Sequence, residues 1–339
     1  MEKRILIVDV NWVGDVLFST PFIRAVREAY PDSYIAALIH PRTKEVLEDN
    51  GRLDELIVYD EEFRHSGLLG KLRLINYLKK KRFDTAFILH RSFTKALIAY
   101  LAGISQRIGY AVKNRSLLLT KAVSEQAGVV HKVEYFLNIA RALGIKPNDN
   151  SYEYFISDPD RARIKDFLKN NGVVDKDIIV VLCPGGNWDP KRWPKNNFAK
   201  LADILAENFN ARIVIAGAKK DADLARDIKG MMKYPPIIAA GKTTLKELGA
   251  LFSRADLVVA NDTGPMHMAV AMKAKTIALF GPTSPEVTGP YGSGDYRVIR
   301  GQPECDVPCY DNKCRENLCM DAIKVEDVAQ AASEMLKEK

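Results

Sequence analysis

The stretch DLVVANDTGPMHMAVAM, residues 256–272, decides how this chain folds. Its apolar first part is typical of a buried strand, which stops abruptly at an Asp-Thr-Gly-Pro turn. Asp262 or Thr263 can cap the helical pattern that follows. Gly264 permits the turn, and Pro265 suits the first helical turn. A strand that turns directly into a helix is one step of a parallel α/β sheet, and the N–H groups at such a helix start can bind phosphate.

The same alternation of strand and helix runs along the whole chain. Val, Ile and Leu fill both faces of the strand-like runs, as expected for parallel strands that are buried on both sides. The chain is therefore predicted to be α/β, with two doubly wound, Rossmann-like domains. The runs occupy residues 4–10, 33–39, 55–60, 84–90 and 106–111 in the first half, and 177–186, 211–217, 236–241, 256–262, 276–281 and 296–301 in the second.

A polar segment at residues 143–160, which contains two prolines, is the best place for a domain boundary. The length of 339 residues also fits two domains. We place the first domain at residues 1–155 and the second at 156–339. The last helical pattern, at 325–339, could pack back on the first domain.

Composition limits the class of protein. Hydrophobic residues make up 47% of the chain and charged residues 27%, which indicates a soluble globular protein. No apolar run reaches the roughly 18 residues of a membrane-spanning helix, and the apolar run at the N-terminus is too short for a signal peptide. We therefore expect a cytoplasmic protein.

The formal net charge of +7 favours an anionic partner, such as nucleic acid, an acidic lipid surface or a phosphorylated substrate. Nucleic acid is the weakest of these interpretations, because the basic residues are scattered and not interleaved with aromatic residues. The segment 67–83 concentrates the charge around an apolar set that includes Leu68, Leu69 and Leu72. It predicts either a helix packed on the core with a solvated basic end, or a surface for acidic lipid headgroups.

Ligands of open parallel sheets bind beyond the carboxyl ends of the strands. After the first strand, Gly14 permits a tight turn and Asp15 follows, either as a helix cap or as a general base. A single glycine here excludes the G-x-G-x-x-G dinucleotide fingerprint. Pro21 predicts either a kinked helix that starts near Asp15 or a new helix that starts after Thr20.

In the second half, Gly185 and Gly186 can expose successive N–H groups to an anion, with Asn187 beside them and Lys191 supplying positive charge. After the next strand, two acids are either helix-start residues or partners of a ribose, namely Asp221 and Asp223. His267 is either a polar group beneath the loop at 262–265 or a ligand contact.

Taken together, several stretches resemble glycosyltransferase family nine, the bacterial lipopolysaccharide heptosyltransferases. They are VGDVLFSTPFIRAVREAYP (13–31), SQRIGY (105–110), CPGGNWDPKRWP (183–194) and NDTGPMHMAVAMKAKTIALFGPTSPEVTGPYG (261–292). The stretch CDVPCYDNKCRENLCMDAI (305–323) resembles the type II branch, which adds the second heptose.

The resemblance implies a GT-B fold, in which two facing Rossmann-like domains enclose an interdomain cleft. It implies an inverting transfer of heptose from ADP-heptose to the inner core of lipopolysaccharide, with no metal or cofactor. The second domain would hold the nucleotide-sugar donor and the first the acceptor. An enzyme of this kind would contact the cytoplasmic face of the inner membrane peripherally.

The resemblance also assigns roles to single residues. Asp15, after Gly14, falls on the family's proposed general base, and Lys191 on the cation that neutralises the diphosphate. Thr263 and Gly264 fall on the phosphate-binding backbone amides. The remaining donor residues would be Gly185, Gly186, Asn187, Asp221, Asp223, Asp262, Pro265 and His267. Five cations of the first domain are candidates for the acidic groups of the acceptor, namely Arg91, Lys95, Arg107, Lys113 and Arg115.

Four cysteines near the C-terminus have the spacing C-x3-C-x4-C-x4-C, namely Cys305, Cys309, Cys314 and Cys319. Metal ribbons generally use C-x2-C pairs, and disulfides are disfavoured in the cytoplasm. Reduced thiols, a metal site and a disulfide all stay open.

Two further functions compete with the heptosyltransferase. One is the same fold acting on another nucleotide-sugar of the cell envelope. The other is a two-domain protein that closes on a ligand without chemistry. A carboxylate at the first strand end and a phosphate-binding turn in the other half argue against the second.

Overall fold

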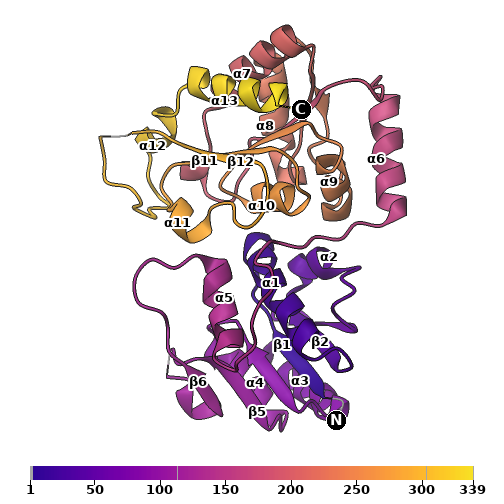
Figure 1. Cartoon of the computed structure of the whole chain (residues 1–339), viewed down its shortest axis with the longest axis vertical. Coiled ribbons are helices and arrows are strands. Elements are labelled where there is room, and N and C mark those ends of the chain that lie inside the picture. The colour runs from indigo at the N-terminus through magenta and orange to yellow at the C-terminus, as the bar shows by residue number, and fades with distance from the viewer. Residues whose placement is uncertain (1–2, 113, 303, 339) are drawn as a thin grey trace. The chain divides into compact units, whose positions relative to one another are not determined.

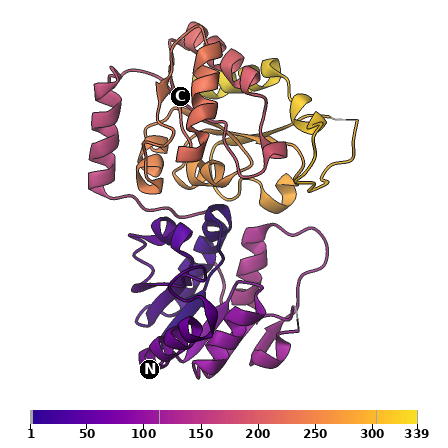
Figure 2. The ribbon, with the colours of Figure 1, turned by 180° about the vertical axis from the view of Figure 1, so that it is seen from behind.

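The computed structural model describes residues 3–112, 114–302 and 304–338. The chain divides into two compact units, Met1–Phe155 and Ile156–Lys339, which Figures 1 and 2 show in indigo to magenta and in pink to yellow. The division falls inside the polar segment 143–160. Each unit contains one six-stranded sheet, in which every strand pair is parallel.

In the first unit, the strands are β1 (Arg4–Val8), β2 (Tyr34–Ile39), β3 (Glu55–Val58), β4 (Thr85–Ile88), β5 (Gln106–Tyr110) and β6 (Lys121–Val123). The helices are α1 (Val13–Ala29), α2 (Lys44–Leu47), α3 (Gly67–Lys81), α4 (Phe93–Leu101) and α5 (Lys132–Arg141), with short 3-10 turns at Pro41–Thr43 and Ser116–Leu118.

In the second unit, the strands are β7 (Ile179–Cys183), β8 (Arg212–Ile215), β9 (Ile237–Ile238), β10 (Leu257–Asn261), β11 (Thr276–Phe280) and β12 (Tyr296–Arg300). The helices are α6 (Asp158–Asn170), α7 (Lys195–Phe209), α8 (Ala222–Met231), α9 (Leu245–Phe252), α10 (Gly264–Ala271), α11 (Pro285–Thr288), α12 (Leu318–Asp321) and α13 (Val325–Lys337), with 3-10 turns at Asp189–Lys191 and Lys219–Asp221.

The two sheets have the same topology. Their strand orders are β3-β2-β1-β4-β5-β6 and β12-β11-β10-β7-β8-β9, which is the doubly wound order 3-2-1-4-5-6 in both units. The strand order reverses between β1 and β4 in the first sheet, and between β7 and β10 in the second. Ligands of such sheets bind outside the carboxyl ends of the strands at this switch point.

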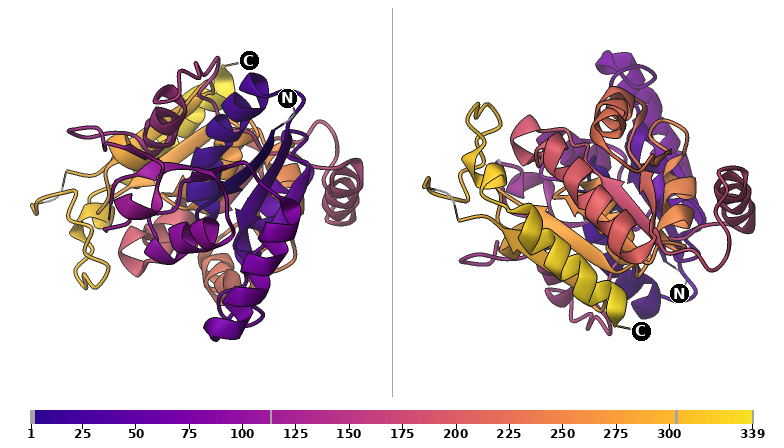
Figure 3. Two further views of the ribbon diagram at one scale, coloured as in Figure 1. Left: turned by 90° about the horizontal axis from the view of Figure 1, so that it is seen from below. Right: turned by 90° about the horizontal axis from the view of Figure 1, so that it is seen from above.

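Helix α13 completes the core of the second unit. Its apolar face, with Val328, Ala332 and Met335, is buried in one cluster with Trp193 and Phe198. It lies beside α7 in Figure 3 and also contacts β10, β11 and β12. The apolar face of the last helix is thus buried within its own unit, and a contact of this helix with the first domain stays a prediction.

Helix α1 runs without interruption through Pro21, which decides between the two helix starts that the sequence allowed. Proline has no N–H to donate to the carbonyl of Leu17 four residues earlier. The hydroxyl of Thr20 donates to that carbonyl instead, at 2.7 Å. The described part of the chain contains no helix with the length and apolar character that a membrane span needs.

Candidate active site

Asn261, the last residue of β10, joins the two loops at the switch point of the second sheet. Its side-chain amide donates to the carbonyl of Pro184 at 2.9 Å, and its side-chain oxygen accepts the N–H of Trp193 at 3.1 Å. Asn261 is fully buried, so both hydrogen bonds are shielded from water. The loop that follows β7 is thereby held against the turn that follows β10.

This arrangement brings Lys191 onto Asp262. The Lys191 ammonium donates to Asp262 Oδ2 at 2.6 Å and lies 4.9 Å from the centre of the Trp188 ring. The hydroxyl of Thr283 donates to the same carboxylate oxygen at 2.6 Å. Asp262 is only 4% exposed, while the Lys191 side chain keeps 19% of its surface. Asp262 therefore anchors a cation whose remaining surface is open to a ligand.

Backbone donors lie next to this pair. Helix α10 begins at Gly264, and the first N–H groups of a helix have no acceptor within the helix. Within the described residues, no other acceptor is found for the N–H groups of Thr263 and Gly264, nor for those of Gly185 and Gly186. The switch point therefore combines one cation with several N–H donors, which is the chemistry of a phosphate site.

Asp221 has the helix-start role that the sequence analysis offered, at the 3-10 turn Lys219–Asp221. Its carboxylate is buried, accepts the N–H of Ala218 at 2.9 Å, and packs so close to Gly185 that a Cβ there would lie 2.5 Å from its Cγ. It shapes the glycine loop, and little of its surface is left for a ribose. Asp223 is exposed on α8 and pairs with Arg226.

Two other predicted donor residues also have contacts within the second unit. His267 is 3% exposed, with Nε2 at 3.9 Å from Asp262 Oδ1, so it lies beneath the loop. Asn187 is exposed, and its side-chain oxygen accepts a hydrogen bond from Lys220. Pro265 stands in the first turn of α10, as its fixed φ favours.

In the first unit, Asp15 is the third residue of α1 and lies in its first turn. The N-cap is Trp12, so the interpretation of Asp15 as the cap is wrong by position. Ser19 follows four residues later and therefore lies on the same face of the helix. Ser19 Oγ lies 2.9 Å from Asp9 Oδ2, which brings a second carboxyl group beneath the face of Asp15.

Asp9 is a buried carboxyl group that the sequence analysis missed. It follows β1 directly, is fully buried, and accepts the N–H of Val10 at 2.7 Å. Ser19 Oγ also lies 2.8 Å from the carbonyl of Val16, and its single proton cannot serve both oxygen atoms. A protonated Asp9 resolves this conflict. Burial raises the pKa of Asp9 to about 7, and the nearby Asp15 carboxylate acts in the same direction.

Lys95, from α4, places a buried cation at the carboxyl ends of the strands of the first sheet. Its ammonium donates to Asn11 Oδ1 at 2.6 Å and to the backbone carbonyl of Asp9 at 3.2 Å, and it lies 3.9 Å from Glu61. Burial lowers the pKa of Lys95 to about 8. Asp9 and Lys95 flank the switch point between β1 and β4, so they are parts of the same site as Asp15.

The sequence of this chain is similar to known proteins over most of its length. It matches glycosyltransferase family 9 (heptosyltransferase) over residues 71–319, which is well over half of the chain. The chain belongs to this family. The predictions of a family 9 glycosyltransferase and of an α/β fold with two doubly wound units are thereby confirmed.

Relatives of this family 9 glycosyltransferase resemble it over most of their length. Lipopolysaccharide heptosyltransferase 2 of Salmonella typhimurium is 29% identical over 310 residues, with 88% of each chain covered. The crystal structure of a family 9 glycosyl transferase from Veillonella parvula is 27% identical, covers 100% of this chain and 99% of that one, and superposes with a TM-score of 0.93. The E. coli ADP-heptose LPS heptosyltransferase II is 24% identical, with 98% of each chain covered and a TM-score of 0.82, and shares the fold.

The five predicted acceptor cations of this family 9 chain differ in their exposure and in their existing partners. Arg91 keeps 47% of its side-chain surface and pairs with Glu125 at 3.4 Å. Arg107 donates to the carbonyls of Leu118, Ile104 and Ser105, and the fully buried Arg115 donates to those of Tyr110 and His90. Arg115 is therefore a structural residue, a correction that follows from its burial. Lys95 is used internally, and Lys113 lies outside the described residues.

The four C-terminal cysteines line one cavity of about 210 Å³, together with Pro190 and Pro282. They are separate thiols, with Cys305 and Cys309 exposed and Cys319 buried. In the described ranges, no group of three His, Cys, Asp or Glu side chains is placed to hold a metal ion. The cavity lies against the loops that carry Lys191 and Thr283, so the cysteine segment supports this side of the site.

Proposed function

We propose that this family 9 enzyme transfers heptose from ADP-L-glycero-β-D-manno-heptose to the inner core of lipopolysaccharide, as the second heptose. The observation that carries the donor assignment is the phosphate-type site of the second unit, where Lys191 meets the N–H groups of Thr263 and Gly264. The heptosyltransferases to which the chain is similar support the choice of sugar and acceptor.

In this proposal, the second unit stabilises the leaving ADP. An inverting transfer is a single displacement, so negative charge grows on the diphosphate as the glycosidic bond breaks. Lys191 and the N–H groups of the β7 and β10 loops would meet that charge. Because Asp262 and Thr283 hold the ammonium in place before the reaction, little reorganisation is needed in the transition state. These groups would neutralise the diphosphate without a metal ion.

The first unit supplies the general base. Asp15 would accept the proton of the acceptor hydroxyl as that oxygen attacks the anomeric carbon. The buried Asp9 lies beside the same face of α1, hydrogen-bonded to Ser19. Arg91, the accessible member of the five cations, would pair with acidic groups of the acceptor. The first unit is thus the acceptor-binding domain of this proposal.

The acceptor is carried by a lipid, so the proposal includes a cytoplasmic enzyme that touches the inner membrane peripherally. Nucleic acid is not among the partners that we propose. The basic residues serve phosphate, acceptor and membrane instead.

The test is calorimetric titration of the full chain with ADP, ADP-heptose and UDP-glucose in the presence of a chelator. Binding of the two adenine compounds, with heptose then transferred to a heptosylated core acceptor, is the expected result. Preference for UDP-glucose would overturn the donor and keep only the displacement chemistry. Binding that requires an added divalent metal would overturn the metal-independent mechanism.

A further inference from the structure

Four large apolar side chains of the first unit are exposed in one short segment. Phe63 is 78% exposed, Leu68 73%, Leu69 72% and Leu72 41%. We call these four residues the leucine patch. Three of them stand in the first two turns of α3, and Phe63 stands in the loop that precedes it.

The patch is distinct from the side of α3 that packs on the sheet. Leu74, Ile75 and Leu78 are buried in the core cluster of this unit. The patch leucines lie at other helical positions, so the outward face of α3 is apolar in its first half. That outward face then becomes basic, because Lys79 and Lys80 are exposed in the last turn. The sequence predicted one apolar set for this helix, but only part of it packs on the core.

The segment that carries the patch is basic, and the acids Asp60, Glu61 and Glu62 directly precede it. The segment from residue 63 to residue 82 contains seven lysines and arginines and no aspartate or glutamate. Among the ion pairs of the described residues, only Lys81 of these seven has a carboxylate partner, Glu55 at 2.7 Å. The nearest exposed acid before the segment, Glu62, is paired with Arg42 at 3.3 Å. The segment 63–82 therefore carries an excess of positive charge beside the patch leucines.

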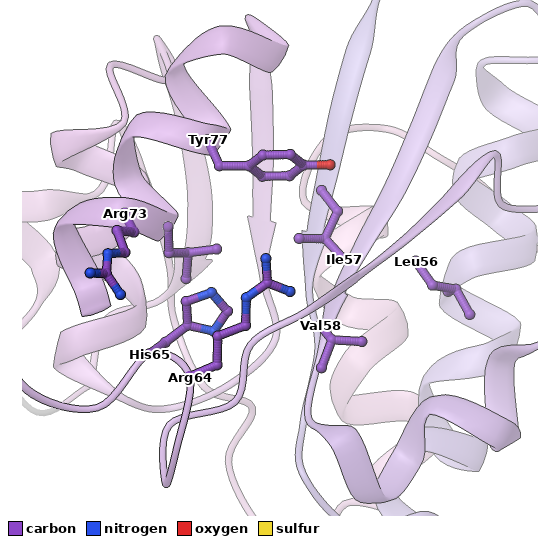
Figure 4. Close-up of a pocket in the computed structure, with 8 residues that line it drawn as sticks. Leu56, Ile57, Val58, Arg64, His65, Arg73 and Tyr77 are labelled. Atoms are coloured by element: carbon purple, nitrogen blue, oxygen red, sulfur yellow. The ribbon is translucent and has the colours of Figure 1, made fainter. Parts of the chain in front are cut away.

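A cavity of about 560 Å³ adjoins the patch, between α3 and the edge strand β3. Arg64 and His65 from the loop and Arg73 and Tyr77 from α3 line it, over a floor that includes Ile57 (Figure 4). Its lining thus includes two arginines and the apolar side chains of β3, which suit a phosphate attached to an apolar chain. An exposed apolar helix face beside such cations is typical of a segment that lies in a membrane interface.

We propose that the leucine patch docks the first unit on an anionic lipid bilayer, with its four side chains in the interface and Arg64 and Arg73 on lipid phosphates. The occupant follows from charge complementarity and from the exposed apolar area, which a phosphorylated soluble partner would not cover. The proposal specifies the membrane contact named above and does not depend on the sugar that the enzyme transfers.

The test is co-sedimentation of the full chain with large vesicles of phosphatidylcholine alone, or of phosphatidylcholine mixed with phosphatidylglycerol. Binding should require the anionic lipid and weaken as salt is added. The double variant Leu68→Ser/Leu69→Ser should bind about tenfold more weakly or worse, because two leucines no longer enter the interface. Arg64→Gln/Arg73→Gln should lose about tenfold as well.

Matched controls come from the same unit. Leu117 is 92% exposed but lies outside the patch, so Leu117→Ser should bind like the unaltered chain. Lys146, another exposed cation, serves as the charge control in Lys146→Gln. Titration with ADP should be unchanged in all variants, which separates a failed membrane proposal from a failed donor assignment.

Two results would overturn the proposal. One is equal vesicle binding by Leu68→Ser/Leu69→Ser and Leu117→Ser, or no binding to anionic vesicles at all. The other is a concentration-dependent dimer, measured by light scattering, that only the patch variant abolishes. In that case a second copy of the chain would cover the face.

Discussion

At the scale of single residues, the proposed donor site depends on a buried carboxylate that holds its cation in place. Asp262 is buried, and its carboxylate holds Lys191 at 2.6 Å and Thr283 at 2.6 Å. A buried charge is stable only with partners of this kind, so each residue of the group fixes the others. The negative charge at position 262, which opposes an anion in isolation, thus becomes the anchor of the cation.

Replacement of Lys191 by alanine should therefore weaken both donor binding and turnover. Loss of one preorganised charge donor typically costs about a hundredfold in rate. Steady-state kinetics and ADP titration measure the two effects. Lys195→Ala is the control, since that lysine is 46% exposed and pairs with Asp227 on the surface. Unchanged kinetics in Lys191→Ala would remove this residue from the site.

Replacement of Asp15 by asparagine tests the base. The amide keeps the size and the position in α1 but cannot accept the proton of the acceptor. Turnover should fall by about a hundredfold or more, while ADP-heptose titration stays close to that of the unaltered chain. If Asp15→Asn turned over at the unaltered rate, the carboxylate would serve only the helix start.

Asp9 makes the stability of the first unit depend on pH. An unfolded aspartate has a pKa of about 3.9, and burial raises that of Asp9 to about 7. Between these values the folded chain binds a proton that the unfolded chain has lost, so the free energy of unfolding falls as pH rises. Asparagine does not titrate, so in Asp9→Asn this fall in the free energy of unfolding is absent. The stability of this variant relative to the unaltered chain should be greater at about pH 8 than at about pH 5.

Urea denaturation at the two pH values measures this difference. The exposed Asp32 of the same unit supplies the surface control Asp32→Asn. Lys95 would complicate measurements at higher pH, because its pKa is lowered to about 8 and its effect has the opposite sign above that value. Parallel stability curves for Asp9→Asn and the unaltered chain would contradict the raised pKa.

The sequence predicted some of these residues and not others, for physical reasons. Lys191 and Asp262 stand in polar turns after apolar runs, where a strand end is easily recognised. Asp9 stands inside such a run, between apolar neighbours, and only the folded chain places it against Ser19. Arg115 has a typical surface residue type, and the sequence contains no sign that backbone carbonyls would bury it.

At the scale of elements, α1 shows how a helix tolerates an internal proline. Thr20 is fully buried, donates to the carbonyl of Leu17 at 2.7 Å, and accepts the N–H of Glu153 at 2.9 Å. It thus replaces the hydrogen bond that Pro21 cannot make and ties the end of the first unit to its first helix.

Thr20→Val should destabilise the first unit by about 1–3 kcal/mol, because the buried carbonyl of Leu17 and the part-buried N–H of Glu153 lose their partner. Thr20→Ser keeps the hydroxyl and should retain most of the stability. Urea denaturation of the two variants separates the hydroxyl from the methyl group. Equal losses in both would mean that packing, not the hydrogen bonds, matters at this position.

Elements with strong local signals were predicted well, and the others were not. The long apolar runs became β1, β2, β7, β10 and β11. The short β6 has two exposed residues out of three and no apolar run to reveal it. For α3, helical periodicity identifies an apolar set but not which of its members meet the sheet, so the exposure of Leu68 and Leu69 emerged only from the structure.

At the scale of the whole molecule, the two units share one sheet topology. They differ in the residues that lie at the carboxyl ends of the strands. Both sheets have the order 3-2-1-4-5-6, and each reverses its order where polar side chains gather. The first switch point carries Asp9, Asp15 and Lys95. The second carries Lys191 and the N–H groups of the β10 turn. In the proposed function, the first edge serves proton transfer and the second binds the diphosphate.

This division predicts that the second unit binds ADP by itself. It has its own core, which α13 completes, and every donor group named above belongs to it. A fragment of residues 156–339 should fold cooperatively and bind ADP within about tenfold of the full chain, since only small changes in ordering entropy are involved. Calorimetry and thermal unfolding measure both properties, and the same fragment with Lys191→Ala is the control. A folded fragment that does not bind ADP would mean that the first unit completes the donor site, and the roles of the two switch points would then have to be shared rather than divided.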